Sequence, residues 1–114
     1  MSQSSGAPDY RESLHRYVVE TAEAVIEGVL GPVEAARRFV GIAAELDALD
    51  EAAFGFFLGL DSESHQYPLG EARGQWSEKA LRREDRALRE FEARMSDEAV
   101  RHCKELLAKY SSRA

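Results

Sequence analysis

The sequence predicts an all-α protein: an antiparallel bundle of about four helices, with a long C-terminal helix and a structured loop at 61–76. Two observations support this class. Apolar residues recur every three or four positions along most of the chain, which is the spacing of amphipathic helices. Glycine and proline interrupt that spacing at only a few places, and neither occurs after residue 74.

The first two helices are delimited by turn residues. Residues 1–7 are rich in serine and glycine and predict a disordered tail, so the single helical domain spans 8–114. Pro8 suits a first helical turn, and apolar residues then follow at helical spacing up to Val29. Gly28 and Gly31 end this helix, and Pro32 is well placed as the first residue of the next one.

The third and fourth helices differ in character. Asp50 is a candidate N-cap for a short helix that contains FGFFLGL, which is apolar on all sides and predicts the centre of the core. Ser77 is a candidate N-cap for a helix that continues to about Tyr110, a length of about 50 Å. Two helices broken near Ser96 are the alternative.

Composition narrows the class of function. The chain has 114 residues and one cysteine, Cys103, so it forms no internal disulfide. No signal peptide and no run long enough for a membrane span is found, which predicts a cytoplasmic protein. Residues 1–60 carry 10 acidic and 4 basic side chains, whereas residues 61–114 carry 11 of each. This balance disfavours nucleic-acid binding and favours either a basic protein partner or simple solubility.

The loop at 61–76 carries the candidate site. Its acidic, imidazole, amide and phenol groups form the predicted partner-binding set: Asp61, Glu63, His65, Gln66 and Tyr67. Other residues are predicted to shape the loop: Ser62, Pro68, Gly70, Arg73 and Trp76. Trp76 is expected to plug the end of the bundle, and Arg73 to bond loop carbonyls or Glu63. In the alternative interpretation the whole loop is a packed connection without chemistry.

Signals for catalysis, cofactors and metals are weak. No Glu-x-x-His pair, phosphate loop or nucleophile motif occurs, so no catalytic residue, cofactor or metal site is predicted. Cys103 falls in the apolar stripe of the last helix and is expected to be an inert core thiol. The arginine-rich run after Ser77 is predicted to be self-paired through Glu78–Arg82, Asp85–Arg89 and Glu90–Arg94.

The loop also carries a resemblance. Ser62-Glu63-Ser64, Pro68-Leu69-Gly70, Arg73 and Trp76 resemble the S-E-T-D-x-x-P-x-G-x-x-R-x-x-W signature of small helical bacterial proteins of unassigned function, with Ser64 for threonine and His65 for the acid. That resemblance implies a fold and no activity. The order Ser62-Glu63, Tyr67-Pro68 is also similar, with different spacing, to nuclease-colicin immunity proteins, which are acidic four-helix inhibitors.

Together these features predict a non-enzymatic acidic protein that binds a basic protein partner, in the manner of an immunity protein or antitoxin. The alternative is a small-molecule or metal-binding protein with a pocket between the 61–76 loop and the C-terminal helix, using Glu63, His65 and Arg73. A homodimer through FGFFLGL and the alanine-rich second helix is compatible with both.

Overall fold

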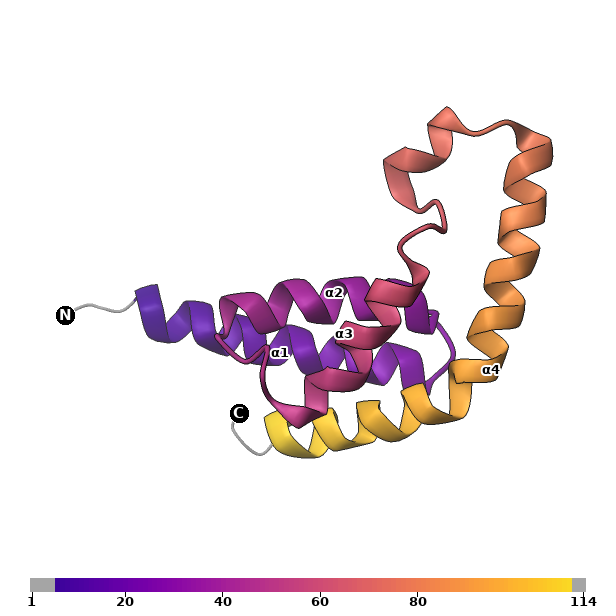
Figure 1. The fold of residues 1–114 in the computed structure, drawn as a ribbon. Helices are drawn as coiled ribbons and strands as arrows, with labels where there is room; N and C mark the ends of the chain where they lie inside the picture. Colours follow the sequence, from indigo (N-terminus) through magenta and orange to yellow (C-terminus); the bar gives the residue numbers. More distant parts are fainter. Residues whose placement is uncertain (1–5, 112–114) are drawn as a thin grey trace.

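The computed structural model describes residues 6–111, which form α1 (Gly6–Ile26), α2 (Pro32–Glu45), α3 (Ala52–Ser64), the 3-10 helix η1 (Gly70–Gln75) and α4 (Glu78–Ser111). The predicted all-α bundle with its long last helix is confirmed. Figure 1 shows α1 and α2 running antiparallel side by side, and α3 packs against α2 and α4. Residues 1–5 of the predicted tail lie outside the described residues, and helix α1 already begins at Gly6.

The turn between α1 and α2 follows the sequence prediction closely. Gly28 has a φ of +79°, a left-handed conformation that costs glycine little. Val29 and Leu30 both donate main-chain hydrogen bonds to the carbonyl of Ala24, at 2.9 and 3.1 Å. Gly31 then occupies the N-cap position of α2 and Pro32 its first turn. This short turn makes α2 return antiparallel to α1.

Aromatic residues from three helices meet in the core. The ring of Phe39 in α2 lies 4.6 Å from that of Phe57 and 6.0 Å from that of Phe54, and Phe54 in turn lies 5.8 Å from Tyr110 of α4. All four residues are at most 1% exposed. The apolar third helix is therefore central to the core as predicted, since burying each such ring contributes about 1.5–3 kcal/mol.

The beginning of α3 differs from the prediction. Its N-cap position is occupied by Glu51, without a side-chain cap, and not by Asp50. The Glu51 carboxylate instead accepts hydrogen bonds from the hydroxyl of Tyr110, at 3.2 Å, and from the ammonium of Lys109. Glu51 therefore joins the start of α3 to the end of α4.

The end of α3 also differs, because the helix continues through Ser64 and takes up the first four residues of the predicted loop. The Ser64 side chain is fully buried, and its hydroxyl donates to the carbonyl of Leu60 at 2.7 Å. Arg37 of α2 donates to the carbonyl of Ser64 at 2.8 Å. A carbonyl at the end of a helix needs such a partner, and here another helix supplies it.

Helix α4 is continuous over 34 residues, which confirms one helix and not two. Figure 1 shows that it bends near its middle, so that its second half lies along the other helices and its first half points away from them. Its buried residues all lie in the second part: Phe91, Ala99, Cys103, Leu106 and Tyr110. The first three turns of α4 are therefore outside the core.

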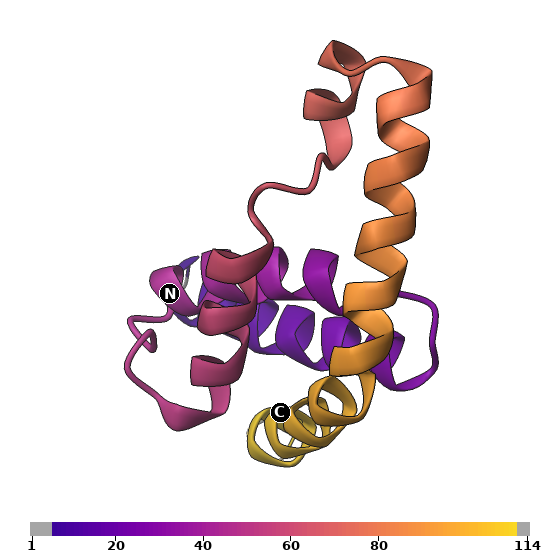
Figure 2. The same ribbon diagram turned by 45° about the vertical axis from the view of Figure 1, so that its right-hand side comes forward.

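These turns and the segment before them form an arm, defined here as residues 65–90. Figure 2 shows the arm as a hairpin of η1 and α4 that rises from the body of the protein. The molecule is accordingly elongated, with extents of 56 × 29 × 24 Å and a radius of gyration of 15.7 Å. A compact domain of 100 residues has a radius of gyration of about 13 Å. None of the helices in the described part of the chain is long and apolar enough to cross a membrane.

Glu92 joins the base of the arm to the body. Its carboxylate accepts a hydrogen bond from the main-chain N–H of Val33 at 2.9 Å, so α4 caps the first turn of α2. A Cβ atom at Gly31 would lie only 2.5 Å from the same carboxylate oxygen. The absence of a side chain at Gly31 therefore leaves room for the cap.

We expect Glu92→Ala to lower the free energy of unfolding by about 1 kcal/mol, because the N–H of Val33 loses its acceptor. Urea denaturation followed by circular dichroism measures this change. The control is Glu90→Ala, which removes an exposed carboxylate two residues away and should change stability by at most about 0.5 kcal/mol. Equal effects of the two substitutions would contradict the capping role.

Candidate functional site

The structure divides the predicted loop into three parts. Residues 61–64 are the last turn of α3, residues 65–69 form a bend, and Gly70–Gln75 form η1. Pro68 is buried within the bend, where it fixes an extended backbone before η1. The segment is thus a structured connection, and its side chains differ greatly in exposure.

The five predicted partner-binding residues are not all on the surface. Glu63, His65 and Gln66 are exposed, as is the loop-shaping residue Ser62. The Nδ1 atom of His65 lies 3.1 Å from the carbonyl oxygen of Ser62. These three exposed side chains at the end of α3 are available to a partner.

The other two, Asp61 and Tyr67, are occupied by the fold. Asp61 lies 3.6 Å from the Nε atom of Arg37, and Tyr67 packs with its ring 5.9 Å from that of Phe91. Arg37 also donates to the carbonyl oxygens of Ser64 and Tyr67, at 2.8 and 3.3 Å. No sequence feature indicates that Arg37 holds the loop, because its partners lie 27 and 30 residues away in the chain.

Arg73 has a different carboxylate partner from the one expected. Its two terminal nitrogens bind the two oxygens of Asp85 at 2.8 and 3.0 Å, and Nη1 lies 3.5 Å from the carbonyl of Pro68. The hydrogen bonds from Arg73 lower the pKa of Asp85 below its ordinary value, which favours the charged pair. The prediction that Arg73 contacts a carbonyl of the loop is confirmed by its contact with Pro68. The prediction that Arg73 pairs with Glu63 was wrong, because its partner is Asp85.

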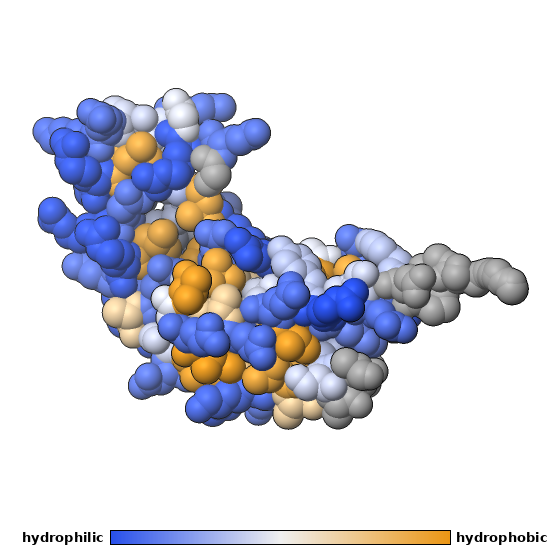
Figure 3. Space-filling view, turned by 180° about the vertical axis from the view of Figure 1, so that it is seen from behind, coloured by the Kyte–Doolittle hydropathy of each residue, from blue (hydrophilic) through white to orange (hydrophobic). Residues whose placement is uncertain are grey.

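Asp85 forms its ion pair with Arg73 and not with Arg89, although the charge of Arg89 also helps to lower the pKa of Asp85. Nor do Glu78–Arg82 and Glu90–Arg94 form ion pairs in the described chain. Trp76 does not plug the bundle: it is 39% exposed near the junction of η1 and α4, because the arm carries it away from the core. Figure 3 shows hydrophilic residues over most of the arm and apolar patches on the body.

A second feature is an acidic row on the solvent side of α1. Its four glutamates, Glu12, Glu20, Glu23 and Glu27, are all exposed. At 100° per residue they fall within a sector of about 80°, opposite the buried residues of the same helix. The exposed Arg16 lies in the same sector, between Glu12 and Glu20, and Glu27 lies one residue beyond the end of α1. The row extends for about 22 Å along the helix axis. The sequence contained this signal as the charged side of an amphipathic helix.

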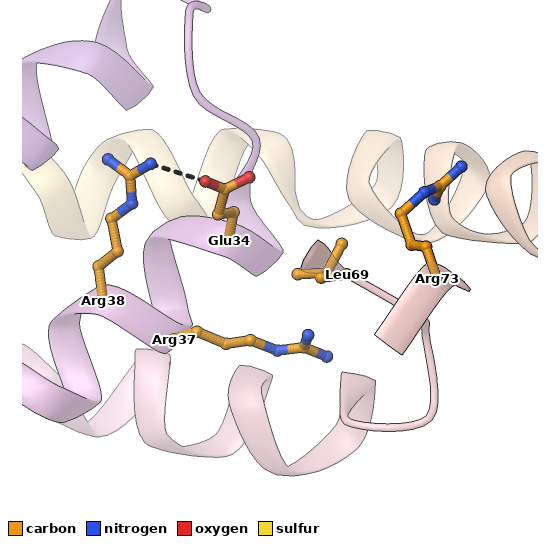
Figure 4. A pocket seen from close by; sticks show the side chains of 5 residues that line it. All are labelled: Glu34, Arg37, Arg38, Leu69 and Arg73. Carbon is orange, nitrogen blue, oxygen red and sulfur yellow. Dashed lines mark hydrogen bonds and ion pairs between the residues drawn. The ribbon is translucent and has the colours of Figure 1, made fainter. Parts of the chain in front are cut away.

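A third feature is a pocket between α2 and the segment that includes η1, shown in Figure 4. Five residues line it: Glu34, Arg37, Arg38, Leu69 and Arg73. Its volume is about 620 Å³. The alternative function placed a pocket between the loop and the C-terminal helix, whereas α4 contributes no lining residue to this one.

Cys103 and His102 occupy separate environments, as expected from their positions on the helix. Cys103 is fully buried, and this burial raises the pKa of its thiol to about 12. The ring of His102 stacks on Phe56 with centroids 4.6 Å apart. Among the described residues, no group of three or more histidine, cysteine, aspartate or glutamate side chains could hold a metal ion.

We expect Arg73→Gln to return the pKa of Asp85 toward its ordinary value of about 3.8 and to increase hydrogen exchange in residues 65–76. Because folding lowers this pKa, the pair stabilises the arm above pH 3.8 and is lost as pH falls through the lowered value. Carboxyl NMR titration measures the first effect. Arg101→Gln, which removes an exposed pair with Glu98, should leave both observables unchanged.

The thiol of Cys103 should react very slowly with iodoacetamide in the native protein at pH 8. With a pKa of about 12, about one thiol in 10⁴ is ionised at that pH, and the sulfur is also shielded from solvent. Intact-mass measurement over time gives the rate, and the same protein in urea provides the reference. Similar rates in both conditions would show that the thiol is accessible.

The chain matches no protein family model, no curated protein and no solved structure. The resemblances of segment 62–76 therefore stay predictions.

Proposed function

We propose that this is a non-enzymatic interaction protein that binds a basic protein partner, with the acidic row of α1 as the main contact surface. An inhibitor of the immunity or antitoxin type, acting in the cytoplasm, is the kind of protein that fits this proposal. The observation that carries it is the alignment of four exposed glutamates, Glu12, Glu20, Glu23 and Glu27, on one side of α1.

The two glutamates at the C-terminal end of the row are arranged against helix stability, whereas Glu12 and Glu20 each have Arg16 four residues away. Glu23 and Glu27 are four residues apart and repel each other by about 0.2–0.5 kcal/mol. They also lie at the end of α1, where the helix dipole is negative, and the last turn of α1 contains no basic residue. Stability alone therefore does not explain this arrangement, whereas a cationic partner would offset both costs.

Neighbouring groups add contact area that charge alone does not provide. Tyr17 is 40% exposed and lies about 60° around the helix from Glu20. Val29 follows the end of the row and is 79% exposed. An exposed tyrosine beside carboxylates is the combination that anchors and orients a basic partner at a binding surface.

The exposed residues at the end of α3 form a second candidate contact. Glu63, His65 and Gln66 are accessible, whereas Tyr67 supports the arm through Phe91. Substituting Tyr67 would therefore disturb the fold as well as any contact. Glu63→Ala combined with His65→Ala is the better test of whether this end of α3 also touches the partner.

We expect Glu20→Lys/Glu23→Lys to weaken binding of the partner about tenfold or more, by replacing attraction with repulsion. The partner is first isolated by affinity capture and then measured as a purified protein by biolayer interferometry. Raising KCl from about 0.1 to 0.5 M should weaken the wild-type complex several-fold, because salt screens exposed charges.

Two controls separate lost binding from lost folding. Glu23→Lys alone should raise the free energy of unfolding by about 0.3–1 kcal/mol, since it places a base at the helix end. Glu71→Lys/Glu90→Lys makes the same charge change on exposed residues of the arm and should retain binding. A complex indifferent to salt and to the α1 substitutions would exclude this surface.

A further inference from the structure

We propose that the pocket between α2 and the arm binds a small organic anion through a phosphate or carboxylate group. Three of its five lining residues are arginines: Arg37, Arg38 and Arg73. They come from two elements that are far apart in the sequence and that the fold brings together. Each of these arginines also has a carboxylate partner, namely Asp61, Glu34 and Asp85, so an anion would have to compete with carboxylates of the protein.

Arg37 is the best-placed anion ligand of the three. Its hydrogen bonds go to the main-chain carbonyls of Ser64 and Tyr67, which carry no full charge. Its nearest carboxylate, Asp61, lies 3.6 Å from Nε, beyond hydrogen-bond distance. These contacts fix the guanidinium, so an anion would bind a preorganised donor, in competition with the ion pair to Asp61.

Arg38 can offer a second guanidinium, because its ion pair with Glu34 is exposed and weak. It binds Glu34 at 2.6 Å, and the two side chains are 38% and 51% exposed. Such surface pairs are weak, so a ligand can replace Glu34 as the partner of Arg38. Figure 4 shows this pair at one side of the pocket and Arg37 extending toward Leu69.

Arg73 and Leu69 complete the site. Arg73 is bound to Asp85 through both terminal nitrogens, so its charge is already paired and it contributes mainly to the wall of the pocket. Leu69 is the one apolar lining residue and offers a surface for a non-polar part of the ligand. A volume of about 620 Å³ lies within the range of about 300–1,000 Å³ that is typical of small-molecule sites.

The ligand class is therefore an anion with an attached apolar group. Phenyl phosphate and benzoate are suitable probes, because they share a ring and differ in the anionic group. Benzamidine has the same ring and a positive charge, and it should not bind. Isothermal titration calorimetry at about 0.15 M KCl compares the three and shows whether phosphate or carboxylate is preferred.

Two substitutions should act in opposite directions. Arg38→Gln should weaken binding of the preferred probe about tenfold, because a charge-assisted hydrogen bond is lost. Glu34→Gln should strengthen it several-fold, because it removes the carboxylate that competes for Arg38. Both residues are on the surface, so thermal unfolding should change little in either variant. A purely structural pair would not give opposite effects.

A matched pair on α4 supplies the control. Arg101 and Glu98 form an exposed contact of 3.3 Å away from the pocket residues, so Arg101→Gln and Glu98→Gln should leave binding unchanged. No binding of phenyl phosphate or benzoate at millimolar concentration would overturn the proposal. So would equal effects of Arg38→Gln and Arg101→Gln. None of the glutamates of the acidic row on α1 lines the pocket. The anion-binding proposal and the protein-binding proposal can therefore be disproved separately.

Discussion

Helix α4 is longer than the body of the protein can cover. It has 34 residues, compared with 14 in α2 and 13 in α3, and its buried residues begin only at Phe91. An uncovered amphipathic helix of three turns is only marginally stable by itself. The bend at 65–69 and η1 return along these turns, and the packing of Tyr67 on Phe91 and the pairing of Arg73 with Asp85 hold them there. The arm follows from this constraint.

The same constraint determines where the candidate sites lie. Because the arm leaves the body beside the start of α2, it places Leu69 and Arg73 opposite Arg37 and Arg38. The arm therefore brings Arg73 close to the two arginines of α2, in a pocket that Glu34 also lines. The acidic row on α1 lies outside this arrangement, since none of its glutamates lines the pocket. The acidic row and the arginine-lined pocket are therefore separate parts of the surface.

Local features were predicted well because neighbouring residues decide them. The Gly31-Pro32 turn and the long last helix are both determined by the backbone preferences of residues close together in the sequence. The N-cap of α4 is also a local feature, because the hydroxyl of Ser77 accepts a hydrogen bond from the N–H of Ala80 at 3.1 Å. The third helix was predicted one turn too short. Its last turn is stabilised by the burial of Ser64 and by the hydrogen bond from Arg37, and both depend on residues distant in the sequence.

By itself, the sequence determined the helices, the buried side of each and the accumulation of acid in the first half. These properties depend on periodicity and composition, which require no knowledge of distant contacts. Only the tertiary structure decided which charged groups pair. Asp85 has Arg89 within reach on its own helix but binds Arg73, and Arg37 holds a loop about thirty residues away. A long charged side chain can reach several partners, and the packing of whole elements selects among them.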